Sequence, residues 1–288
     1  MGSACIGSTR RRSSAWHDGP WLALLASPVG STGRLGAALR RPVTLLDSWP
    51  YPLWIAHRGA GKLAPENTLA AFRLGAQLGF RAFECDVKLS RDGVPFLLHD
   101  DTLDRTSNGR GDAGAQTWSD LAQLDAGSWH SRAFAGEPLA SFAAIAAFCL
   151  RNGHALNIEI KPSPGREHET GVVVAREAAR LWAGQATPAL LSSFEPESLE
   201  GARIGAGSLP RALLIDQLWD GWFERAQALA CVAVVANHRL FDRAMVDRLH
   251  AAGLRALAYT VNDDSAAQKL LGFGLDGLIT DAVDRFAP

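Results

Sequence analysis

Short apolar runs and segments of helical periodicity alternate along most of the chain. From residue 155 onward, helical segments separate strand-like runs at 155–161, 189–194, 211–215, 232–236, 255–260 and 275–279. The intervening helices are expected at 169–182, 196–202, 219–230, 242–252 and 265–271. Strands separated by helices of about ten residues form parallel βαβ units. The pattern therefore predicts a parallel α/β structure.

Earlier in the chain, further strand-like runs occur at 54–56, 82–89 and 94–98. Apolar residues at helical spacing predict a helix at 68–78, capped by Asn67. Asp92-Gly93 is typical of a two-residue hairpin loop, which would set Asp86 opposite His99. Near the C-terminus, helix capping is also expected of Asn262, Asp263 and Asp281.

The number of strand-like runs is one more than a closed (β/α)8 barrel needs. We assign 94–98 to the descending arm of the hairpin, because a parallel neighbour cannot follow so short a turn. The chain has 288 residues, 47% of them hydrophobic, and one barrel needs about 250 residues. We predict an α/β fold, a TIM barrel at 51–288 with the hairpin and a loop insertion at the C-terminal face of its strands.

Residues 1–50 differ from the rest, with several arginines, few acids and no sustained periodicity. They are predicted to be a loosely ordered N-terminal extension. We expect a cytoplasmic protein, with an organelle transit peptide as the alternative for this Arg-rich, acid-poor segment. No run reaches the about 18 apolar residues of a membrane span.

Composition limits the partners of the protein. The formal net charge is −1 and no long basic stripe exists, which argues against a nucleic-acid surface. The four cysteines are scattered without a CxxC pair, which favours a reducing compartment over a disulfide framework or a zinc site. A nucleic-acid partner is therefore not expected, and the oligomeric state stays open.

Acidic side chains gather on two of the predicted strands. Side chains of a strand alternate between its faces, so Glu84 and Asp86 share one face of 82–89, and Glu159 shares a face with Lys161 on 155–161. Carboxylates about 4 Å apart repel each other strongly, so such a cluster predicts a bound cation. Oxygen ligands select a hard ion, and the sequence thus predicts one divalent cation, Mg²⁺ or Ca²⁺.

Two histidines accompany these acids. His57 and His99 each follow a predicted strand, the position at which barrel enzymes keep their chemistry, and imidazoles transfer protons near pH 7. Arg58 and Lys161 can hold an anion beside them. Cation, proton-transfer groups and anion-binding groups together indicate cleavage of a phosphate ester. A serine nucleophile would need a Gly-x-Ser-x-Gly elbow, which the sequence lacks.

From Trp54 to the C-terminus, the chain resembles the glycerophosphodiester phosphodiesterase family. The matching motifs, in the order of the family, are His57-Arg58-Gly59, Ala64-Pro65-Glu66-Asn67-Thr68, Glu84-Cys85-Asp86-Val87, His99-Asp100, Leu103-Asp104-Arg105-Thr106, Glu159-Ile160-Lys161, Ser192-Ser193-Phe194 and Tyr259-Thr260-Val261-Asn262. The resemblance implies a TIM barrel, one divalent cation and a role in lipid and glycerol metabolism. It also implies hydrolysis of glycerophosphodiesters to glycerol 3-phosphate and an alcohol. Tyr259 departs from the family, which usually has tryptophan there, and this bears on the shape of the substrate wall.

These observations give a hypothesis for the site. The cation is assigned to Glu84, Asp86 and Glu159. General acid/base catalysis is assigned to His57 and His99, and binding of the substrate phosphate to Arg58 and Lys161. Pocket positions are assigned to Glu66, Phe194 and Tyr259. The roles of the two histidines stay open, as does the attacking group, which is either a glycerol hydroxyl through a cyclic phosphate or a water molecule.

Three alternatives are weighed against this hypothesis. A cyclising phospholipase acting on phosphoinositides also uses two histidines on a barrel. It would be expected to have an apolar rim that binds membranes, and the sequence shows none. A glycosidase would explain the paired carboxylates, yet it has no use for the histidines and the lysine. A binding barrel with a dead site predicts that a metal ligand or a histidine is lost, and the sequence retains all of them.

Overall fold

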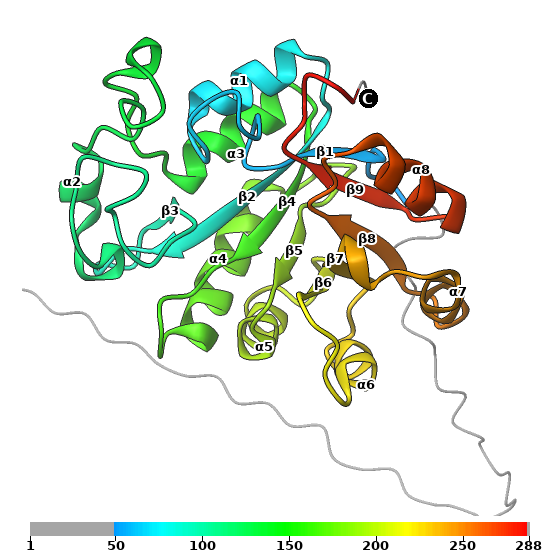
Figure 1. The fold of residues 1–288 in the computed structure, drawn as a ribbon. Helices are drawn as coiled ribbons and strands as arrows, with labels where there is room; N and C mark the ends of the chain where they lie inside the picture. Colours follow the sequence, from blue (N-terminus) through cyan, green and yellow to red (C-terminus); the bar gives the residue numbers. More distant parts are fainter. Residues whose placement is uncertain (1–48, 287–288) are drawn as a thin grey trace, which may run out of the picture. The chain divides into compact units, whose positions relative to one another are not determined.

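The computed structural model describes residues 49–286, which form a closed barrel of parallel strands surrounded by helices (Figure 1). The barrel strands are β1 (Trp54–Ala56), β2 (Ala82–Leu89), β4 (Ala155–Ile160), β5 (Leu190–Ser193), β6 (Arg211–Ile215), β7 (Ala233–Asn237), β8 (Arg255–Tyr259) and β9 (Gly277–Thr280). β1 closes the ring because it pairs in parallel with both β2 and β9. The predicted TIM barrel is therefore confirmed.

The helices follow the predicted alternation. They are α1 (Leu69–Gln77), α3 (Phe142–Arg151), α4 (Glu167–Leu181), α5 (Pro196–Gly205), α6 (Trp222–Ala228), α7 (Arg243–Ala251) and α8 (Asp264–Phe273). Short 3₁₀ helices lie at Ala113–Ala115, Arg132–Phe134 and His238–Leu240. None of the helices in residues 49–286 is long and apolar enough to cross a membrane. The extension predicted at 1–50 falls almost wholly outside the described residues, so both it and the cytoplasmic location stay predictions.

Each strand of the barrel divides its side chains between two apolar layers. On β8, Leu257 points into the barrel, where it packs with Leu214 and Val235, whereas Ala256 and Ala258 pack against the outer helices. This alternation is what the two-residue period of a strand requires when both faces are buried. Cys85 of β2 lies on the helix side and is fully buried, as its position between Glu84 and Asp86 predicts.

The hairpin after β2 corrects the predicted register by one residue. β3 (Pro95–Leu97) runs antiparallel to β2 with Val87 opposite Leu97, so Leu98 and not His99 lies level with Asp86. The turn has three residues instead of two, and Gly93 closes it at φ +79°. A glycine in the left-handed region is what a three-residue hairpin loop demands. His99 consequently sits just beyond the paired region.

The segment between β3 and α3 is the predicted loop insertion. It contains α2 (Trp118–Leu121) and has a small apolar core of its own, in which Phe96 of β3 packs near Trp118 with ring centroids 6.2 Å apart. His130 Nε2 lies 3.0 Å from the Lys62 carbonyl oxygen, which connects the insertion to the loop after β1. The insertion therefore lies at the face of the barrel where the strands end.

Three of the predicted helix caps are wrong, and each of these side chains has another partner. Thr68 caps α1 by accepting a hydrogen bond from the Ala71 N–H, while Asn67 bonds to Asp86. Asp263 caps α8 as predicted. Asn262 bonds instead to Asp281, and Asp281 bonds to His57. These are contacts between distant segments, which a local capping pattern cannot reveal.

Candidate active site

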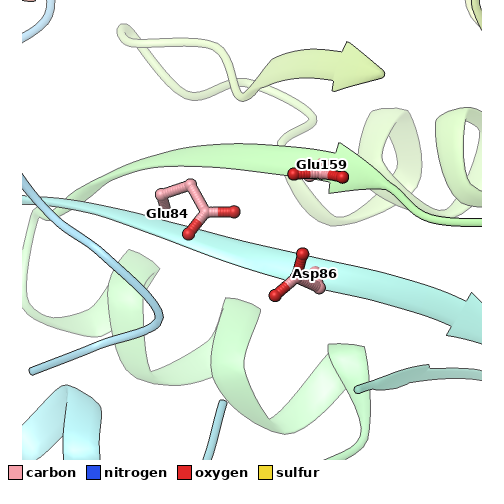
Figure 2. A group of neighbouring side chains, drawn as sticks. All are labelled: Glu84, Asp86 and Glu159. Carbon is pink, nitrogen blue, oxygen red and sulfur yellow. The ribbon is translucent and has the colours of Figure 1, made fainter. Parts of the chain in front are cut away.

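Three carboxylates converge from the neighbouring strands β2 and β4. Glu84, Asp86 and Glu159 each offer an oxygen, and these oxygens lie within 4.8 Å of one another (Figure 2). The parallel register places Asp86 opposite Glu159 on the neighbouring strand, so the two-residue period brings all three to one face. Asn67 fixes Asp86 in place, since its Nδ2 donates to Asp86 Oδ2 at 2.8 Å and its Oδ1 accepts from the Asp86 N–H at 3.1 Å.

Burial and mutual repulsion set the charge of this cluster. All three residues are more than nine-tenths buried. Burial, together with the nearby Asp86 carboxylate, raises the pKa of Glu84 to about 8 and also raises that of Glu159. Burial acts upward on the pKa of Asp86 too, but the cations of Arg58 and Lys161 outweigh it, so this pKa is lowered. The protein alone therefore does not stabilise three negative charges here.

The cluster fits a divalent cation. Glu84 Oε1 and Asp86 Oδ1 are buried and have no hydrogen-bond partner among the described residues. Buried carboxylate oxygens without a partner are costly, and a cation supplies the missing interaction. An all-oxygen donor set is the kind that hard ions prefer. The structure thus contains a possible metal site at the place the sequence predicts.

His57 follows β1 and is held by the last strand of the barrel. Its backbone N–H donates to the Thr280 carbonyl at 2.9 Å, and its Nδ1 lies 2.6 Å from Asp281 Oδ1. Nε2 is then turned toward the cluster, 3.8 Å from Glu84 Oε2. Burial acts to lower the pKa of His57, but the hydrogen bond to Asp281 and the charge of Glu84 outweigh it and raise the pKa. Asp281 therefore fixes both the tautomer and the orientation of the ring.

His99 has the same arrangement on a different segment. Its Nδ1 lies 2.7 Å from Asp100 Oδ1, and its Nε2 lies 3.0 Å from Lys161 Nζ. An ammonium group only donates, so Nε2 accepts and the ring is neutral with its proton on Nδ1. Burial lowers the pKa of His99, which agrees with this neutral form. Lys161 also donates to Glu159 Oε1 at 2.8 Å, which joins His99 to the carboxylate cluster.

Arg58 crosses the cluster from the loop after β1. Its backbone N–H donates to Glu84 Oε2 at 3.1 Å, its Nε lies 3.1 Å from Asp86 Oδ2, and its Nη1 donates to Glu66 Oε1 at 2.8 Å. The loop packs closely on α1, because a Cβ on Gly59 would lie 2.8 Å from Ala71 Cβ, and Gly59 has φ +99°. Only glycine allows this approach and this backbone conformation together.

Two adjoining cavities open at this face. One, of about 310 Å³, is lined by both histidines and by Tyr259, and the other, of about 360 Å³, shares His99, Lys161 and Phe194 with the first. The rings of Phe194 and Tyr259 meet edge to face with centroids 5.7 Å apart. The Tyr259 hydroxyl donates to Asp216 Oδ1 at 3.2 Å. Glu66 does not line these two cavities.

The carboxylate partners of the two histidines were not predicted from the sequence. Asp281 was expected to cap a helix, and Asp100 was noted only as part of a motif, yet each binds the Nδ1 of a histidine. Asp281 could have been found from the closed barrel, because the residue after the last strand must lie beside the residue after the first. Arg105, which bonds to Glu66 and Asp100, offered no such signal beyond its motif.

A family model agrees with the geometry of the site. The model of the glycerophosphoryl diester phosphodiesterase family matches residues 57–285, a span that runs from His57 past Asp281. The chain belongs to this family. The protein is therefore a glycerophosphodiester phosphodiesterase, a hydrolase of phosphoric diesters, as the sequence predicts. The match decides against the glycosidase alternative.

Several members of the glycerophosphodiester phosphodiesterase family match most of the chain. YhdW of Bacillus subtilis is 35% identical over 240 residues, 80% of this chain and 94% of that protein. The glycerophosphodiester phosphodiesterase of Caldanaerobacter subterraneus is 31% identical over 236 residues, 80% of this chain and 93% of that enzyme. A phosphodiesterase from Oleispira antarctica, solved in complex with the product sn-glycerol-3-phosphate, is 35% identical with a TM-score of 0.76, covering 82% of this chain and 95% of that one.

Proposed function

We propose that the protein hydrolyses glycerophosphodiesters to glycerol 3-phosphate and an alcohol, with one divalent cation, Mg²⁺ or Ca²⁺, and with His57 and His99 as the acid/base pair. The observation that carries the proposal is the cluster of three carboxylates within 4.8 Å, beside a cavity lined by both histidines. The Oleispira antarctica relative, whose structure holds sn-glycerol-3-phosphate, supports the choice of product.

Glu84, Asp86 and Glu159 would hold the cation. A cation bound there would neutralise the carboxylates and would supply Lewis-acid polarisation of the phosphoryl group, which favours attack at phosphorus. Arg58 and Lys161 line the cavity of about 310 Å³ and stabilise the negative charge that grows on the phosphoryl oxygens in the transition state. The side chains of Arg58 and Lys161 are already held by Asp86 and Glu159, so they need little reorganisation when the substrate binds.

The two histidines divide the proton transfers. One Nε2 takes the proton of the attacking oxygen, and the other delivers a proton to the leaving alkoxide. Asp281 and Asp100 keep the Nδ1 protons of His57 and His99 in place, so each ring exchanges protons through Nε2. The attacking oxygen belongs either to a glycerol hydroxyl or to a water molecule.

The test measures release of glycerol 3-phosphate from glycerophosphocholine, glycerophosphoethanolamine, glycerophosphoinositol and lysolipids. We expect release from glycerophosphodiesters, loss of that release after chelation, and recovery with Mg²⁺ or Ca²⁺. Full activity after complete metal removal would contradict the proposed requirement for a divalent cation. Cyclic inositol phosphate formed from phosphoinositides, without glycerol 3-phosphate from any diester, would favour the phospholipase alternative.

A further inference from the structure

One arginine of the loop insertion binds two carboxylates at once. Arg105 donates to Glu66 through Nη1 at 2.7 Å and Nη2 at 2.8 Å. It donates to Asp100 through Nε at 2.6 Å and Nη2 at 2.9 Å. A planar guanidinium provides such paired bonds in a fixed geometry, which a lysine ammonium cannot reproduce. The two carboxylates are therefore held in a defined relation to each other.

Each of these carboxylates holds a residue of the candidate site. Glu66 Oε1 also accepts from Arg58 Nη1 at 2.8 Å, and Asp100 Oδ1 lies 2.7 Å from His99 Nδ1. Ion pairs thus run without a break from Asp86 through Arg58, Glu66 and Arg105 to Asp100, and a hydrogen bond from the His99 ring to Asp100 completes the chain. Arg105 is the link in the middle of this chain, and it connects the carboxylate cluster to His99.

Arg105 itself lies away from the reacting groups. It lines neither of the two cavities at the barrel mouth, and its side chain is 45% exposed, compared with 14% for Glu66 and 27% for Asp100. A side chain so exposed adds little to packing. Its hydrogen bonds do affect Asp100, because they hold the pKa of that carboxyl well below its usual range. Asp100 accordingly stays charged and remains an acceptor for His99.

We propose that Arg105 is a positioning residue, which holds Arg58 and His99 in the orientation needed for phosphodiester cleavage by fixing Glu66 and Asp100 together. The inference rests on the proposed function, because it assigns a purpose to the alignment of these two groups. A purely structural role would be different. In that case Arg105 would only fasten the insertion to the loop before α1, and its loss would loosen the insertion without changing turnover.

The test compares Arg105→Ala and Arg105→Lys with wild type in the full-length protein. We expect kcat to fall about 10- to 100-fold in the alanine variant with KM changed by less than about 3-fold, because charge-assisted hydrogen bonds that orient catalytic groups are lost. Added guanidinium ion should restore part of kcat in the alanine variant. The lysine variant should recover little, since it cannot bond to both carboxylates in pairs.

The matched control is Arg110→Ala. Arg110 lies in the same insertion, its side chain is 75% exposed, and it pairs with Asp104 at 3.7 Å. The kcat of Arg110→Ala should equal that of wild type.

A second comparison uses Asp100→Ala alone and together with Arg105→Ala. Because Arg105 acts partly through Asp100, the double variant should lose less than the product of the two single losses.

The outcomes separate this inference from the proposed function. A wild-type protein that releases no glycerol 3-phosphate would defeat the proposed function itself. An active wild type with an Arg105→Ala variant of equal kcat would overturn the positioning role alone. A fall in kcat that follows a lower melting temperature and that guanidinium does not reverse would also overturn it, in favour of simple fastening of the insertion.

Discussion

The two halves of the barrel are built from similar strands that bear different kinds of side chain. β2 and β4 bear the acids Glu84, Asp86 and Glu159, whose oxygens are crowded within 4.8 Å, and His57 follows β1. β6, β7 and β8 present buried apolar side chains to the barrel interior, such as Leu214 and Val235. Burying apolar surface stabilises a protein by about 25 cal/mol per Å², whereas buried like charges reduce stability. The first half therefore concentrates the charged groups of the candidate site, whereas the interior of the second half is mainly apolar.

The contrast implies that activity and stability can be lost separately. In the first half, polar side chains are held by specific hydrogen bonds, so a substitution there removes a chemical group while the core stays packed. In the second half, an interior side chain that does not line the candidate site, such as Leu257, can be removed to leave a packing cavity without the loss of a site group. Variants of each half should therefore differ in which property they change, and three predictions test this.

The largest effect is expected for the histidines of the first half. His57→Ala or His99→Ala should reduce kcat by about 10²- to 10⁴-fold, the usual contribution of general acid/base catalysis. Their melting temperatures should stay close to that of wild type. His168→Ala is the control, because His168 is exposed on α4. Near-full turnover in a folded His57 or His99 variant would show that the acid/base pair is wrongly assigned.

In the second half, Leu257→Ala should reduce stability and leave activity unchanged. Leu257 is fully buried on β8, and removing its side chain should lower the unfolding free energy by about 2 to 5 kcal/mol. Its kcat, measured well below the melting temperature, should stay near wild type. Urea denaturation gives the loss, and Leu271→Ala, at a position 40% exposed on α8, should cost less than about 0.5 kcal/mol. A Leu257 variant of unchanged stability would remove the contrast.

The smallest effect is expected on stability, from the buried carboxylate of Glu84 in the first half. The pKa of Glu84 in the metal-free folded protein is raised above its ordinary value, so its contribution to stability is present at low pH and is lost as the pH rises toward 8. Glu84→Gln cannot ionise, and without metal at pH 8 it should exceed wild type in stability by about 1 to 3 kcal/mol. Thermal melts in chelator between pH 5 and 8 measure this.

Adding Mg²⁺ or Ca²⁺ provides the control for that comparison. The cation should stabilise wild type more than Glu84→Gln, because the variant offers one fewer negative ligand. Equal stabilisation of both proteins would place the bound ion elsewhere. Metal-free melts with the same pH dependence in both proteins would show that Glu84 does not carry the buried charge.

The local pattern of the sequence predicted most of the barrel and the three carboxylates. Strands such as 211–215 match their observed bounds, because an apolar run between turn residues is a local signal. Glu84 and Asp86 could be assigned to one face by the two-residue period alone. Bringing Glu159 to them needed only the expectation that parallel strands end at the same face.

Contacts that depend on exact register or on closure of the ring were beyond this reasoning. The hairpin register was wrong by one residue because Arg91-Asp92-Gly93 forms the turn in place of Asp92-Gly93 alone. The bond between His57 and Asp281 joins residues 224 positions apart, and it exists only because β1 meets β9. Short polar residues near a helix favour capping as the local interpretation, and long-range partners override it.

The pairing of β1 with β9 also governs when the enzyme becomes competent during its synthesis. His57 emerges early, but its backbone bond to Thr280 and its ring bond to Asp281 await the synthesis of β9, the last strand of the barrel. A nascent chain, or one truncated before Thr280, can contain every carboxylate of the cluster and still lack an oriented imidazole at His57. Closure of the barrel by β9 is therefore the step that orients His57 beside the carboxylate cluster.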